Sequence, residues 1–251
     1  MEVALQWLKN ARGIMSEIEN TQQENITKAA TLMADCIEKG HWVHTFGCGH
    51  ATIPIQEMYP RIGGFVGFHP ICELPLTFFT QIVGDLGVHQ FVFLERVEGY
   101  GVQIMKGYNF DKDDVMWIFS HTGINNVNID IALEAKKRGM KVIAYGAAAQ
   151  AKGKKTRHSS GKTIFEIADL VVDSCAPAGD ATVHLKNNQD PVGPVSTIAC
   201  VWMTVCTVAE ILDSRGVKLY IHPSHNVPGD TTAPERLAAC LAEYKRRVAG
   251  V

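Results

Sequence analysis

The sequence predicts an α/β fold built around a parallel sheet that is buried on both faces. Four short apolar runs are separated by helical segments or long crossovers, a pattern typical of a parallel sheet between two layers of helices. Two of these runs end in glycine-containing turns, at 47–49 and 120–123, and a helical segment follows each turn. Ligands of such sheets bind at the carboxyl ends of the strands, so both turns are expected at one site.

Two N-terminal helices are predicted first, over residues 2–19 and 21–39. Thr21 and Glu24 have the spacing of a capping box that opens the second helix. Glycine at position 40 then ends that helix.

The elements that follow are predicted from apolar runs and helical periodicity. Strands are expected at 41–46, 63–68, 114–119, 141–145 and 170–173, and helices at 49–60, 125–138, 195–213 and 233–248. Between these, 69–110 is the least readable segment and is expected to hold one or two helices. Residues 217–222 are expected to form a short strand or turn.

Length and composition indicate one globular domain of 251 residues. We divide it into N-terminal helices (1–39), sheet core and site (40–231) and a C-terminal helix (232–251). The formal charge of −2 provides no basic field, so neither nucleic acid nor a membrane surface is an expected partner. The apolar run 195–212 contains Glu210 and several hydroxyl residues, which favours a buried helix over a membrane span.

The cysteines and the N-terminus point to a cytoplasmic protein. None of the seven cysteines has Cys-x-x-Cys spacing, and free thiols in this number are typical of a reducing compartment. Glu2, Lys9 and Arg12 interrupt any signal-peptide pattern.

The first glycine turn contains Gly47 and Gly49, which would let the backbone approach a ligand closely. The same glycines could equally serve only to make a tight turn between strand and helix. A dinucleotide fingerprint needs a third glycine where this chain has Thr52, so a nicotinamide cofactor is not expected.

The second turn carries hydroxyl and amide groups suited to a phosphate. Ser120, Thr122 and Gly123 precede a helix whose amino end attracts anions, and Asn125 and Asn126 add further donors. The alternative is a helix cap without a ligand. Since no Gly-Lys-Ser/Thr motif follows, the turn is not an ATP-cleaving P-loop.

Candidate acid–base residues are Glu57, His50 and His225. Glu57 follows the first turn on a helix, where it could take a proton from carbon, and Arg61 could pair with it or with the substrate. His50 adjoins Gly49, and His225 lies in a loop before the last helix. The alternative for Glu57 is a solvated surface residue. No histidine pair has metal-ligand spacing on a pocket helix, so no metal is predicted.

A basic stretch at 152–162 is either a lid over a phosphate or a solvated loop, and its composition favours the loop. Within it, the run from Arg157 through Ser159 to Gly161 has the character of an anion-binding turn. Arg157 and Ser159 are therefore further candidate ligand contacts.

Both turns resemble those of the sugar isomerase (SIS) domain family. The segment 129–139 resembles this family as well, and the segments 156–162, 168–173 and 176–181 resemble a stand-alone branch of it that is similar to phosphoheptose isomerase. The resemblance covers about residues 20 to 231. It implies a flavodoxin-like αβα sandwich with five parallel strands, N-terminal helices that pack on a partner subunit, and a homodimer or homotetramer.

The resemblance also implies roles for individual residues. Ser120 and Thr122 would bind the phosphate of the sugar, Glu57 would be the base, and His225 is the best positional match for a histidine acid. Phosphoheptose isomerases often carry a zinc-binding histidine where this chain has Ile53, so no cofactor is expected. His121 replaces the variable residue of a Ser-x-Ser-Gly turn and could alter specificity.

The leading hypothesis is an aldose–ketose isomerase that acts on a phosphorylated sugar through an enediolate intermediate. One alternative is a phosphosugar sensor without chemistry. Another is a different reaction of the family, such as cleavage of a sugar ether or deglycation. Only about 40 residues precede the first strand, too few for a DNA-binding helix-turn-helix in addition to the family's own helix.

Overall fold

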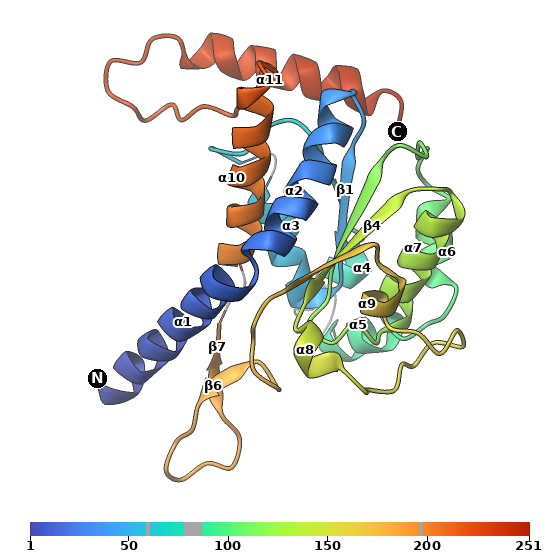
Figure 1. The fold of residues 1–251 in the computed structure, drawn as a ribbon, viewed down its shortest axis with the longest axis vertical. Helices are drawn as coiled ribbons and strands as arrows, with labels where there is room; N and C mark the ends of the chain where they lie inside the picture. The colour runs from blue at the N-terminus through green and yellow to red at the C-terminus, as the bar shows by residue number, and fades with distance from the viewer. Residues whose placement is uncertain (59–60, 78–86, 196–197) are drawn as a thin grey trace.

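The computed structural model describes residues 1–58, 61–77, 87–195 and 198–251, and it has a parallel sheet at its centre (Figure 1). The strands are β1 (Val43–Gly47), β2 (Phe68–Ile71), β3 (Val115–Phe119), β4 (Lys141–Gly146) and β5 (Leu170–Asp173). Their order is β2-β1-β3-β4-β5, with every pairing parallel. This flavodoxin-like order confirms the predicted fold class and places the switch point between β1 and β3.

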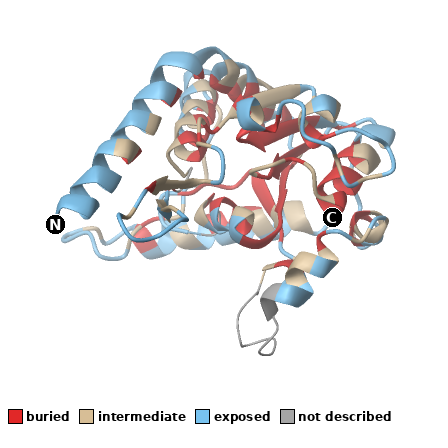
Figure 2. Ribbon diagram, turned by 90° about the horizontal axis from the view of Figure 1, so that it is seen from below, coloured by how far each residue is buried: buried red, intermediate tan, exposed pale blue. Residues whose placement is uncertain are grey.

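Both faces of the sheet are covered by helices, as the apolar strands predicted (Figure 2). Along β3, Trp117 and Phe119 pack with α2 (Gln23–Glu38) and α10 (Ile198–Ser214) on one side of the sheet. The alternating residues Met116 and Ile118 pack with α7 (Asn126–Lys137) on the other. The side chains of all four are buried, and each contributes about 1.5–3 kcal/mol to stability.

The predicted capping box between the first two helices is wrong. Thr21 is still the last residue of α1 (Glu2–Thr21), and its hydroxyl donates to the carbonyl of Glu17, 2.7 Å away. Helix α2 begins after Gln22 without a side-chain cap. The Gln22 side-chain oxygen instead accepts from the backbone N–H of Asp173, at 3.0 Å, which ties the helix junction to the end of β5.

The second strand is shifted from its predicted position. Residues 63–67 contain three glycines and form a turn, with Phe65 in an isolated bridge to Ile221. Strand β2 starts only at Phe68. Its Pro70 is compatible with a strand because β2 lies at the edge of the sheet, where one side needs no ladder hydrogen bonds.

The segments around the first turn contain several short helices. A 3-10 turn, η1 (Gly49–Thr52), leads into α3 (Ile53–Met58), and the end of the predicted helix 49–60 lies outside the described residues. The described parts of 69–110 contain three helices instead of the expected one or two, with 78–86 outside the description. They are α4 (Leu74–Thr77), α5 (Gly87–Leu94) and α6 (Tyr100–Met105).

A hairpin between β5 and α10 was not predicted. Its strands are β6 (Ala181–Val183) and β7 (Val192–Pro194), and it lies beside α1 (Figure 1). The Trp7 indole N–H donates to Pro194 O at 3.2 Å, and the Asn10 amide donates to Thr182 O at 2.7 Å. The hairpin is therefore held by residues more than 170 positions away in the chain.

The remaining helices include two short ones, α8 (Ala148–Ala151) and α9 (Ile164–Ile167), around the basic stretch, and α11 (Ala233–Val248). The predicted helices at 125–138, 195–213 and 233–248 are thus confirmed as α7, α10 and α11, apart from residues 196–197, which lie outside the described ranges. Through Cys240, α11 packs on Trp42 and Val66 near the amino ends of the first strands. Across the described ranges, no helix is both long enough and apolar enough to cross a bilayer.

Candidate functional site

A cavity of about 480 Å³ lies at the carboxyl ends of β1, β3 and β4. Its size is within the range of small-molecule sites. The polar side chains that line it are those of His50, Ser120, His121, Tyr145, Ser174 and Asp180. Its apolar walls include Ile53, Pro54, Phe119, Pro194 and Val195. The site therefore joins both predicted turns to the segment that leads into the β6–β7 hairpin.

The two glycines of the first turn lie where neighbouring residues of the protein leave no room for a side chain. A Cβ at Gly47 would lie 2.5 Å from the backbone oxygen of Ala51, and Gly49 has φ +59° with Phe91 2.4 Å from its Cβ position. These contacts favour the tight-turn interpretation for both residues. The turn brings the next residue, His50, to the cavity wall.

The second turn also contributes its first two residues to the cavity. Ser120 is buried, and its hydroxyl accepts from the backbone N–H of Gly123 at 3.1 Å. His121 lines the cavity beside it, whereas Thr122 and Gly123 are not among the described lining residues.

The amino end of α7 is occupied by groups of this chain. Asn125 donates to the Glu95 carboxylate at 2.6 Å, and Asn126 donates to the Arg96 carbonyl at 2.8 Å. The backbone N–H of Val127 donates to Glu95 O at 3.2 Å. Burial raises the pKa of Glu95. A carboxylate from the end of α5 thus lies where the sequence suggested a phosphate.

Arg157 and Ser159 are likewise engaged within the chain. The Arg157 guanidinium donates to Asn125 Oδ1 at 2.8 Å. Both the backbone N–H of Ser159, at 2.9 Å, and its hydroxyl donate to Glu98, and these bonds lower the pKa of that carboxyl. The predicted anion-binding turn therefore holds an internal carboxylate.

Glu57 and Arg61 form an ion pair with each other outside the described cavity lining. Glu57 lies one helical turn beyond Ile53 on α3, and its side chain is about a quarter exposed (28%). His225 is an exposed loop residue and is also not among the lining residues. Of the three predicted catalytic residues, the structure brings only His50 to the cavity.

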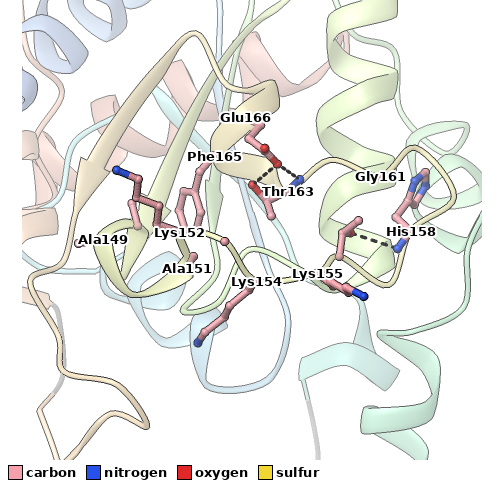
Figure 3. Close-up of a pocket in the computed structure, with 13 residues that line it drawn as sticks. Ala149, Ala151, Lys152, Lys154, Lys155, His158, Gly161, Thr163, Phe165 and Glu166 are labelled. Carbon is pink, nitrogen blue, oxygen red and sulfur yellow. Dashed lines mark hydrogen bonds between the residues drawn. The ribbon is translucent and has the colours of Figure 1, made fainter.

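A second cavity, of about 620 Å³, borders the basic stretch (Figure 3). Lys152, Lys154 and Lys155 line it, and all three are exposed. Figure 3 shows their side chains pointing in different directions, so their ammonium groups do not converge on one point. This arrangement favours the solvated-loop interpretation over a phosphate lid.

In the described part of the chain, one group of side chains lies close enough together to hold a metal ion: His41, Asp111 and Asp113. They lie near the amino ends of β1 and β3, at the opposite edge of the sheet from the first cavity. Asp113 is already paired with Lys112 at 2.7 Å. At the cavity itself, Ile53 offers only hydrocarbon where a zinc ligand was considered.

Sequence reasoning missed four residues that the structure brings to the sites. Glu95 lies in a segment without readable periodicity, and Tyr145 reads as an ordinary strand residue. Ser174 and Asp180 lie in the segment after β5, where the family-like run 176–181 was a signal without an assigned role.

Comparisons with known proteins agree with this fold. A family model described as the SIS domain matches residues 6–147. A UPF0309 protein of Shouchella clausii is 32% identical over 251 residues, covering 99% of each chain. A UPF0309 protein of Oceanobacillus iheyensis is 34% identical over 218 residues, covering 86% of this chain and 87% of that protein.

Among solved structures, a phosphoheptose isomerase from Francisella tularensis has a TM-score of 0.50 at 17% identity. The likeness covers 83% of this chain and 95% of that one. At this level of identity it shows a shared fold only. The match of the family model over more than half the chain, together with these full-length relatives, establishes that the protein belongs to the SIS domain family.

Proposed function

We propose that this protein binds a phosphorylated sugar in the 480 Å³ cavity and interconverts its aldose and ketose forms. The observation that carries the proposal is the meeting of both turns at this cavity, with His50, Ser120 and His121 on its wall. The family and the isomerase named among its structural neighbours support the same ligand class.

In this proposal the phosphate lies against the second turn, at Ser120 and His121. Of the other predicted contacts, six shape that edge of the sheet: Gly47, Gly49, Thr122, Gly123, Asn125 and Asn126. A base removes the proton from the carbon next to the carbonyl, an enediolate forms, and the proton returns to the neighbouring carbon. His50 would move the proton between the two oxygens. Glu57 stays the predicted base, and His225 the alternative acid.

A phosphosugar-binding role without chemistry is the second candidate. The observation that favours it is the pairing of Glu57 with Arg61 outside the described lining, which leaves the predicted base engaged. A protein of this kind would bind the sugar phosphate without exchanging its carbon-bound proton.

A thermal-shift screen against pentose, hexose, heptose and amino-sugar phosphates, with the free sugars as controls, tests the proposal. A ligand at a hundred times its Kd adds about 2.7 kcal/mol of stability. We expect stabilisation by at least one phosphate and none by its free sugar, followed by proton exchange in deuterated water. Stabilisation without exchange would favour the sensor, and no stabilisation by any phosphosugar would contradict the proposal.

The proposal includes a homodimer or homotetramer in the cytoplasm. All seven cysteines are free in the structure, which supports a reducing compartment.

A further inference from the structure

Asp180 is a carboxylate at the cavity wall for which the function above provides no role. It is the one carboxylate among the described lining residues. Its backbone N–H donates to Pro177 O at 3.0 Å. Its side chain has no hydrogen bond or ion pair with any other described residue, although most carboxylates in the described structure do have one. The oxygens of Asp180 are therefore available to a ligand.

The backbone at Asp180 is held in an uncommon conformation. Its φ is +69°, and in the described ranges only Cys175 shares a positive φ among residues other than glycine. Both lie in the segment that leaves β5 for the hairpin. Such conformations cost free energy for residues with a Cβ, and they are concentrated at functional sites.

The segment around Asp180 is fixed at both ends. On one side, the backbone N–H of the buried Ser174 donates to Gly146 O at 2.8 Å, at the end of β4. On the other side, Trp7 and Asn10 of α1 hold the hairpin that begins at Ala181. The backbone that carries Asp180 is thus anchored on both sides before any ligand arrives, which lowers the entropy cost of binding.

We infer that Asp180 is a substrate-contacting residue that accepts hydrogen bonds from the hydroxyl groups of the sugar. This inference rests on the proposed function. An ionised carboxylate only accepts hydrogen bonds and repels a phosphate. The phosphate therefore lies at the Ser120–His121 side of the cavity, and the polyol end of the ligand faces Asp180. The residue selects for a polyol, not for phosphate esters in general.

The test is isothermal titration calorimetry with glucose 6-phosphate, fructose 6-phosphate, glucosamine 6-phosphate, sedoheptulose 7-phosphate and inorganic phosphate. The variants are Asp180→Asn and Asp180→Gly, because asparagine and glycine both accept a positive φ without a fold-breaking strain. Asp190→Asn is the matched control, since Asp190 is exposed in the loop of the same hairpin and loses the same charge.

We expect every sugar phosphate that binds the wild type to bind both Asp180 variants at least about ten-fold more weakly, the loss typical of a hydrogen bond to a charged group. Inorganic phosphate should bind the variants as well as the wild type or better. The Asp190→Asn protein should behave as the wild type.

The outcomes separate the inference from the function on which it rests. Wild-type affinity of both Asp180 variants for a sugar phosphate would overturn the inference and leave the proposed function standing. An equal loss for inorganic phosphate would also overturn it, because the effect would not concern hydroxyl groups. If no sugar phosphate binds the wild type, both the function and the inference fail.

Discussion

At the scale of single residues, two buried histidines, His44 and His69, lie together near the amino ends of β1 and β2, and the pKa of one of them is lowered. His44 Nε2 lies 3.1 Å from Asp114 Oδ2, and His44 Nδ1 lies 3.0 Å from His69 Nδ1. Since the carboxylate accepts, His44 donates to Asp114 from Nε2. Burial, and secondarily the neighbouring His44, lower the pKa of His69 from near 6.5 to about 4.

This depressed pKa predicts lower stability in weak acid. Between pH 6.5 and 4 the unfolded chain binds a proton that folded His69 does not, so stability is lost as the pH falls through this window. The loss attributable to His69 approaches about 3 kcal/mol near pH 4. Urea unfolding at pH 7 and pH 4 measures this loss. His69→Gln keeps an amide that can hydrogen-bond to His44, and its stability should fall less than that of the wild type between these two pH values. An equal fall in stability would contradict the assignment.

A second prediction at this scale concerns Glu57. If it is the base, Glu57→Gln should lower isomerase turnover at least about 100-fold, while sugar-phosphate affinity stays close to that of the wild type. Glu24→Gln is the matched control, because Glu24 forms the same kind of exposed i,i+4 pair, with Lys28. Steady-state kinetics on the ligand found in the thermal screen gives the answer. Unchanged turnover would remove Glu57 from the mechanism and leave the ion pair with Arg61 as its role.

At the scale of elements, sequence periodicity correctly predicted the helices and strands whose positions depend only on which of their residues are buried. Strands β3 and β4 and helices α7 and α11 were predicted within one or two residues, because their apolar pattern matches the layers they contact. Strand β2 was predicted at the wrong position because His69 and Pro70 interrupt its apolar pattern. The strand is defined by its pairing with β1, which the local sequence does not show. The β6–β7 hairpin has three-residue strands and depends on distant α1 contacts, which no local pattern contains.

The same distinction applies to the site. The meeting of His50 and Ser120 followed from the parallel sheet, since both follow the carboxyl ends of neighbouring strands. The position of Asp180 at the cavity depends on the path of the chain between β5 and the hairpin. The approach of Glu95 to α7 depends on packing after a segment with no periodic signal. Long-range contacts of this kind cannot be predicted from spacing.

The dependence of the hairpin on α1 predicts a local effect. Trp7→Ala removes the hydrogen bond to Pro194 and the indole that lies 2.6 Å from the Cβ position of Gly193. We expect faster amide hydrogen exchange in residues 181–194, while the five-stranded sheet keeps its protection. Asn20→Ala is the control, because Asn20 is on the same helix and exposed. Equal protection of the hairpin in Trp7→Ala and wild type would show that α1 does not hold it.

At the scale of the whole molecule, α1 presents apolar side chains to solvent. The helix projects from the body and is largely exposed (Figure 2), with Leu5, Leu8 and Met15 among the exposed large apolar residues. Apolar side chains that gather on one exposed helix mark an interaction surface. In a chain of this family, this observation supports packing of α1 on a second copy, in line with the homodimer or homotetramer that the family resemblance implies.

Charge placed on this surface should therefore dissociate the assembly. Leu5 and Leu8 are three residues apart and share one side of α1, so Leu5→Glu with Leu8→Glu would put two carboxylates into the contact. We expect light scattering coupled to gel filtration to give an oligomer for the wild type and a 27.5 kDa monomer for the double variant. Asn20→Glu, at an exposed position near the other end of α1, should leave the oligomer intact. A monomeric wild type would contradict the assembly, and an oligomeric double variant would place its interface elsewhere.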